Sequence, residues 1–250
     1  MTAFRRRIPA VLTASALALA LCLSAPAARA VQIPVDLELV LAVDSSSSVD
    51  YDEFNLQAYG IAAAFRDARV IEAITSGGIG AIAVTLVQWA SAGTNAQHVS
   101  IGWTLIDSAE RAEAFAETLQ FMPRDVDGGG TSIGNAIRFS AAQFGTSPYE
   151  GFRQVIDVSG DGIDNQVDPV REARAEAIGQ GITINGLTIL NEEPRLDEYY
   201  RREVIGGPGA FVIEAKDYAD FSRAIRDKLL REISDVPMAS VPPGTSLAAR

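Results

Sequence analysis

Residues 37–48 read LELVLAVDSSSS and join a strand to a polar turn. The first seven residues form an apolar run broken only by Glu38, which is typical of a strand covered on both faces of a sheet. Asp44 and four serines follow directly. The segment therefore predicts the central strand of an α/β protein, with polar side chains at its carboxyl end.

Strands and helices alternate along the rest of the chain. Further strands are predicted at 78–87, 99–104, 153–158, 182–189 and 210–213, with 99–104 at an edge. Helices are predicted at 50–69, 108–121, 134–144, 169–178, 196–201 and 218–233. This alternation predicts an α/β fold with a single doubly wound, mostly parallel sheet and helices on both faces.

The two ends of the chain differ from the middle. Residues 1–30 have an arginine-rich start, an apolar stretch and a final Ala-Arg-Ala, which together predict a signal peptide. An uncleaved anchor is the alternative. Residues 31–234 are predicted as one domain, and the Pro-, Ser- and Gly-rich residues 235–250 as a disordered tail. We expect an exported protein, periplasmic or secreted, with no membrane span after cleavage.

Cysteine content and charge exclude several classes of function. The only cysteine, Cys22, lies in the predicted signal peptide, so the remainder has no disulfide or thiol chemistry. The signal peptide holds four arginines and no acid, so its removal lowers the net charge from −11 to −15. A surface this acidic repels nucleic acid and anionic lipid. Nucleic acid is therefore not an expected partner.

Three polar segments fall at predicted strand ends or beside them. They are 44–48 (DSSSS), 128–132 (GGGTS) and 159–162 (SGDG). In an open parallel sheet the carboxyl ends of the strands form the ligand crevice, so we expect these segments to converge. Carboxylate and hydroxyl donors suit Mg²⁺, Mn²⁺ or Ca²⁺ rather than zinc or copper. In the D-x-S-x-S pattern, Asp44, Ser46 and Ser48 can face one point.

D-x-S-x-S, Gly-Gly-Thr and a later Asp-Gly, in this order, resemble the metal-ion-dependent adhesion site of von Willebrand factor type A domains. The resemblance spans roughly residues 35–233. The phrases GGTSIGNAI, VIDVSGDG, GITINGL and VIGGPGAF resemble a bacterial subfamily of exported type A-like proteins. The family fold is the doubly wound sheet already predicted from the strand pattern.

The resemblance implies a role for each motif residue. Ser46, Ser48 and Thr131 would coordinate the metal by their hydroxyls, and Asp44 and Asp161 would hold it directly or through water. One coordination position stays open in the family for a carboxylate from a protein or peptide partner. Mg²⁺ is the first expectation for the metal, with Mn²⁺ or Ca²⁺ as alternatives. Ser47 stands where many members have glycine.

Each motif alone has an ordinary explanation, since Asp, Ser and Gly favour caps, loops and turns. Asp164 and Asn165 are predicted to be loop residues, with the rim of the metal site as the alternative. Asp50 and Asp52 are predicted to start a helix, with a second cation site as the alternative. We expect Trp89 and Trp103 to pack against the strands and His98 to be exposed.

The chain has few of the residues on which enzyme catalysis commonly depends. One histidine and no cysteine after residue 30 leave no Ser-His-Asp or Cys-His set, and the Gly-rich loop lacks the lysine of a phosphate-binding loop. We therefore predict a metal-dependent binding module and no enzyme. The alternatives are metal-dependent hydrolysis of a phosphoester and a structural envelope protein with a vestigial site.

Overall fold

The computed structural model describes residues 31–93, 95–126, 128–166 and 169–234. The predicted signal peptide, residues 1–30, and the predicted tail, residues 235–250, lie outside these described residues. The helices and strands given below all belong to the unit that begins at Gln32. Within the described residues, no helix combines the length and apolar character needed to cross a membrane.

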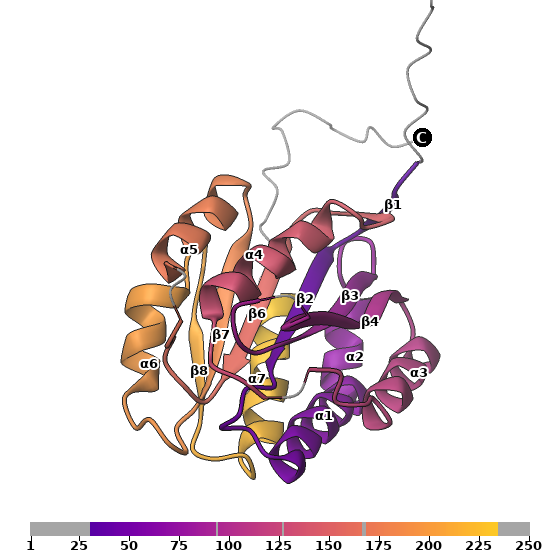
Figure 1. Ribbon diagram of the computed structural model, residues 1–250. Helices are drawn as coiled ribbons and strands as arrows, with labels where there is room; N and C mark the ends of the chain where they lie inside the picture. The colour runs from indigo at the N-terminus through magenta and orange to yellow at the C-terminus, as the bar shows by residue number, and fades with distance from the viewer. Residues whose placement is uncertain (1–30, 94, 127, 167–168, 235–250) are drawn as a thin grey trace, which may run out of the picture. The chain divides into compact units, whose positions relative to one another are not determined.

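Strands and helices alternate along this unit as the sequence predicts (Figure 1). The strands are β1 (Ile33–Val35), β2 (Leu37–Asp44), β3 (Ile82–Trp89), β4 (Gln97–Ile106), β5 (Tyr149–Gly151), β6 (Gln154–Gly160), β7 (Thr183–Ile189) and β8 (Val212–Ala215). The helices are α1 (Tyr51–Arg66), α2 (Ala68–Thr75), α3 (Ala109–Gln120), α4 (Ile133–Phe144), α5 (Val170–Gly179), α6 (Leu196–Tyr199), the π-helix η1 (Tyr200–Val204) and α7 (Phe221–Ser234).

The central sheet has six strands in the order β4-β3-β2-β6-β7-β8. All neighbours are parallel except β4, which pairs antiparallel with β3 at one edge. The mixed α/β fold with a mostly parallel sheet is confirmed, as is the edge position of the strand predicted at 99–104. Strand order reverses between β2 and β6, and this reversal marks the crevice where ligands bind in open α/β sheets.

Helices cover both faces of the sheet (Figure 1). On one face α1, α2, α3 and α7 share an apolar core, in which the rings of Phe65 and Phe115 meet edge to face at 4.8 Å. On the other face α4, α5 and the α6–η1 segment form a second core. Each residue of β2 is buried, as its apolar run predicts, and burial of each large apolar side chain contributes about 1.5–3 kcal/mol.

The helix predicted over 50–69 has a confirmed start and a wrong end. Asp50 accepts a hydrogen bond from Glu53 N (2.8 Å), and Asp50 N donates to the Glu53 carboxylate (2.9 Å), so the helix begins with a capping box. The helix ends at Arg66. Asp67 is extended, and its side chain accepts from Arg69 N to start a second helix, α2.

Two short strands escaped prediction from the sequence. β1 and β5 form a separate parallel pair of three residues each. Neither segment alternates apolar and polar residues long enough to indicate a strand. The pair brings the start of the domain beside the turn that leads into β6.

Candidate metal centre

Two neighbouring strands bring the predicted carboxylates together. Asp44 is the last residue of β2, and Asp161 directly follows β6. Because β2 and β6 pair in parallel, with Val43 opposite Ser159, both carboxylates lie at the same edge of the sheet. This edge is the carboxyl end, where the strand order reverses, as the sequence predicts.

A chain of short contacts joins four of the five predicted residues. Ser46 N donates to Asp44 Oδ1 at 2.7 Å, which folds the turn back on the end of the strand. The hydroxyls of Ser46 and Ser48 are 3.1 Å apart, and Ser48 Oγ donates to Asp161 Oδ1 at 2.8 Å. Two carboxylates and two hydroxyls therefore gather at one place.

Thr131, in the loop before α4, lies beside Gly162, which directly follows Asp161. It is 5% exposed, and a methyl group on Gly162 would stand 3.6 Å from Thr131 Oγ1. Asn165 holds the loop, because its side chain accepts from Thr131 N (2.9 Å) and its own N–H donates to Thr131 O (3.0 Å). The hydroxyl of the next residue, Ser132, accepts a hydrogen bond from Asn135 at the start of α4 (3.0 Å).

Asp164 and Asn165 act as loop residues that fix the edge of the centre. Asp164 Oδ2 accepts from Ile133 N at 2.7 Å, which satisfies a free N–H at the start of α4. The structure thus gives this pair a positioning role for the Thr131 loop. Ser47 acts similarly: its hydroxyl accepts from Gly129 N (2.7 Å), so it ties the serine turn to the Gly-rich loop.

Asp44 is the most perturbed carboxylate of the centre. It is fully buried, and its Oδ2 has no hydrogen-bond partner among the described residues. Burial first, and then the neighbouring Asp161 carboxylate, raise the pKa of Asp44 to about 7. Glycine is required beside it, because a methyl group on Gly160 would lie 2.8 Å from Asp44 Oδ2. The site thus holds a buried acceptor that none of the described residues satisfies.

Two further residues brace the centre and carry no signal in the sequence. Arg124 donates to the carbonyl oxygens of Ser45 (2.9 Å) and Ser46 (3.1 Å), and its guanidinium lies 5.2 Å from the centre of the Tyr51 ring. Tyr218, just before α7, donates from its hydroxyl to Asp161 Oδ2 at 3.0 Å. Both come from segments far from the motifs, so only the tertiary fold reveals them.

We expect Tyr218→Phe to lower the free energy of unfolding by about 1–2 kcal/mol in metal-free buffer. The buried Asp161 Oδ2 loses its donor in this variant, and an unsatisfied buried acceptor costs about that much. Urea denaturation measures the change. Tyr59→Phe is the matched control, because Tyr59 is half exposed on α1 and should change stability by less than about 0.5 kcal/mol. Equal effects of the two substitutions would contradict the bracing role of Tyr218.

The donor set is oxygen alone. In the parts of the chain that the structure describes, no three His, Cys, Asp or Glu side chains are placed to hold a metal. The centre instead combines two carboxylates with hydroxyls. Hard cations such as Mg²⁺ and Ca²⁺ prefer such oxygen ligands. The buried Asp44 Oδ2, which has no partner among the described residues, is also an oxygen donor that a cation could satisfy.

The fold is similar to that of several solved structures. A von Willebrand factor type A protein from Catenulispora acidiphila is 22% identical, with a TM-score of 0.53 over 80% of this chain and 43% of that one. The pilus adhesin SpaC from Lactobacillus rhamnosus GG is 14% identical, with a TM-score of 0.57 over 80% of this chain and 31% of that one.

A third similar structure is the proximal thread matrix protein 1 of the mussel byssus, solved with a zinc-occupied MIDAS motif. It is 16% identical, with a TM-score of 0.53 over 82% of this chain and 48% of that one. The chain thus spans between about a third and a half of the length of these structures. At these identities the likeness establishes the fold alone.

Residues 34–237 match the family described as "Protein of unknown function (DUF1194)", and the chain belongs to this family. The match covers nearly all of the described residues. Among curated proteins, no match was found.

Proposed function

We propose that this protein is an exported binding module that holds a divalent cation and recognises a protein or peptide partner through a carboxylate that completes the metal shell. Asp44, Ser46, Ser48, Thr131 and Asp161 would hold the cation. Mg²⁺ is our first choice, with Mn²⁺ and Ca²⁺ as alternatives.

The observation that carries the proposal is the buried Asp44 Oδ2, which lacks a partner among the residues described and lies at the strand-order reversal. Leaving a carboxylate buried and unpaired is costly, and a bound cation would remove that cost. Ser46 and Ser48 lie beside Asp44 and Asp161 with hydroxyls that can serve as neutral ligands. Five donors from three segments thus suit one hard cation.

The charge of the ligand set favours an acidic partner. Two carboxylates balance the charge of a divalent cation without exceeding it, and the hydroxyl ligands add no negative charge. The cation would therefore keep enough positive character locally to attract a carboxylate, even in an acidic protein. Tyr51 follows the serine motif 44–48, and Ile163 follows the motif 159–162. Both side chains are exposed and offer apolar contact to a peptide that carries the carboxylate.

A peptide library displayed on phage tests this function and needs no candidate partner. Selection on the immobilised protein in Mg²⁺, with elution by EDTA, is expected to enrich peptides that share an Asp or Glu. Replacement of that residue by Asn or Gln should abolish binding. Thr131→Ala should abolish it as well, because the variant loses one proposed ligand.

Ser132→Ala is the matched control. The Ser132 hydroxyl bonds to Asn135, so its removal should leave peptide binding intact. Circular dichroism of both variants checks that the fold is kept. Peptides that bind equally well in EDTA, or that retain binding to Thr131→Ala, would contradict the proposed function.

We also propose export, with residues 1–30 as the cleaved signal peptide and residues 31–234 as the functional domain. The basic start and the Ala-Arg-Ala end of the first segment support it. The periplasm and the cell exterior both fit.

A further inference from the structure

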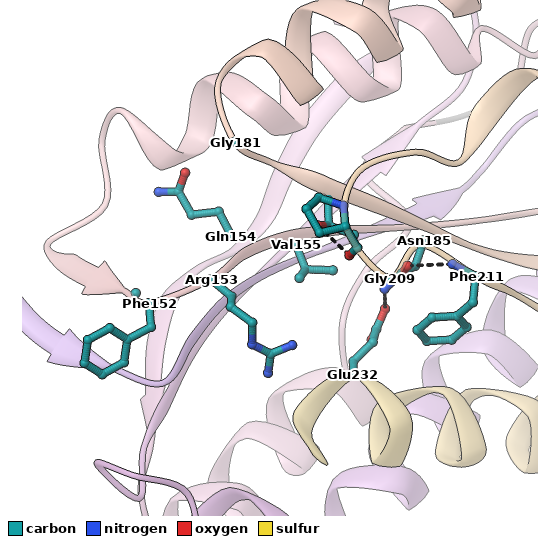
Figure 2. Close-up of a pocket in the computed structure, with 12 residues that line it drawn as sticks. Phe152, Arg153, Gln154, Val155, Gly181, Asn185, Gly209, Phe211 and Glu232 are labelled. Carbon is teal, nitrogen blue, oxygen red and sulfur yellow. Dashed lines mark hydrogen bonds between the residues drawn. The ribbon is translucent and has the colours of Figure 1, made fainter. Parts of the chain in front are cut away.

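A second feature lies at the opposite end of the sheet. A pocket of about 690 Å³ opens at the amino ends of β6 and β7 (Figure 2). Its walls come from the turn between β5 and β6, the start of β7 and the segment 208–211, and Glu232 of α7 closes one side. β6 starts at this pocket and ends at Gly160, directly before Asp161, so the pocket is separate from the candidate metal centre.

Beside the pocket lies a buried cluster of charged and polar side chains. Lys228 Nζ is 2.8 Å from Asp157 Oδ1 and also contacts the Glu232 carboxylate. Asn185 donates from Nδ2 to Glu232 Oε1 (2.8 Å) and accepts from Phe211 N (3.1 Å), as Figure 2 shows. These four side chains of Asp157, Asn185, Lys228 and Glu232 are at most 3% exposed.

The cluster holds two carboxylates against one ammonium. Glu232 Oε2 and Asp157 Oδ2 have no hydrogen-bond partner in the described part of the chain. Burial raises the pKa of Asp157 against the opposing effect of the adjacent Lys228, and the nearby Glu232 carboxylate also raises it. Because an unpaired buried carboxylate is costly, the cluster would gain from one more positive charge. Glu232 is the member of the cluster that lines the pocket.

We propose that this pocket binds a small aliphatic primary amine carrying a single positive charge, with its ammonium group directed at the Glu232 carboxylate. Val155 and Pro208 give the walls apolar surface for an aliphatic body, and Phe152, 77% exposed, stands at the pocket wall with its ring free for further contact.

The pocket suits an amine better than a metal ion or a polycation. Glu232 is the only carboxylate among the described residues that line the pocket, whereas the candidate metal centre brings two carboxylates together with hydroxyls. An ammonium group needs one carboxylate and has three donors that carbonyl oxygens can also accept. One carboxylate balances one positive charge, so a second charge on the ligand would be left unpaired in the pocket. A monoamine is therefore the expected ligand class.

Butylammonium is the probe for the test, with 1-butanol and butyrate as probes of matched size that are neutral and negatively charged. The full chain, labelled with ¹⁵N, is titrated with each by NMR. The Asn185 side-chain amide and the Phe211 backbone amide report, since both belong to the hydrogen-bond chain that ends on Glu232. Butylammonium should give saturable shifts of both signals, and the other two probes should give none.

Two variants test the residues that carry the proposal. Glu232→Gln keeps the size of the side chain and an acceptor for Asn185 but removes the charge, so butylammonium should bind at least about tenfold more weakly. Thr183→Trp fills the pocket and leaves the buried cluster intact, so it should weaken butylammonium binding as much. This variant tests the proposal by itself if Glu232→Gln does not fold. Glu110→Gln, on α3, is the control and should bind as the wild type.

Equal shifts with butylammonium and 1-butanol would overturn the proposal, since the charge would then contribute nothing. Unchanged affinity in Thr183→Trp would overturn it too, because binding would then lie elsewhere on the molecule.

Discussion

In calorimetric titration with Mg²⁺, Asp44→Ala and Asp161→Ala are expected to give no heat of binding, whereas the wild type gives a saturable isotherm. Each substitution removes one of the two carboxylates from the proposed ligand set, and a single carboxylate with neutral hydroxyls holds a divalent cation much more weakly. We expect an affinity loss of at least about 100-fold, near 2.7 kcal/mol. Titration with Mn²⁺ and Ca²⁺ should rank the metals and show the same loss.

Asp52→Ala is the matched control for charge. Asp52 is exposed in the first turn of α1, close in sequence to the serine turn, and contributes to none of the contacts given above for the centre. Its removal should leave the isotherm unchanged at moderate salt, where exposed charges are screened. A wild type that binds none of the three cations would contradict the assignment of the centre, as would full binding by Asp44→Ala.

Asp44→Asn should raise the free energy of unfolding in EDTA at pH 8 by about 2–4 kcal/mol, although it removes metal binding. The folded-state pKa of Asp44, about 7, lies above its ordinary value of 3.8 because the side chain is buried beside Asp161. Each pKa unit corresponds to about 1.4 kcal/mol. The asparagine carries no charge to bury, so the variant avoids this cost.

The same shift fixes the sign of the pH dependence. A pKa raised on folding gives stability that is complete below pH 3.8 and is lost as pH rises to about 7. Urea denaturation of metal-free wild type should therefore show a decline across this window, and Asp44→Asn a smaller one. Asp157 shifts in the same direction in both proteins, so the difference between them isolates Asp44. An Asp44→Asn protein less stable than the wild type at pH 8 would contradict this account.

Much of the fold could be predicted because its strands are strongly patterned. Residues 37–43 form a nearly continuous apolar run, and the structure places them in a central strand with every side chain buried. The sheet-edge rule then predicts that Asp44 and Asp161 meet, and they do. Thr131 joins them through a loop whose position no local pattern specifies.

The parts that escaped prediction depend on contacts between distant segments. Tyr218 donates to Asp161 across 57 positions, and Arg124 reaches Ser45 across 79. Neither residue belongs to one of the three motifs, and no local sequence pattern marks either position as part of the centre. The break at Asp67 was missed for another reason: the apolar spacing continues across it, and only the extended backbone of that residue separates the two helices.

The hydrogen bond between Ser48 and Asp161 spans 113 positions and crosses the pairing of β2 with β6. Contacts this remote form late in folding, since the chain must first pay the entropy of closing a long loop. The cation would thus find its ligands only in a nearly complete fold, and it would leave the nascent chain unbound. Binding of the proposed cation would then favour the folded state, with a gain that rises as the logarithm of the free cation concentration. For a chain that folds after export, the surrounding cations would act as a folding aid.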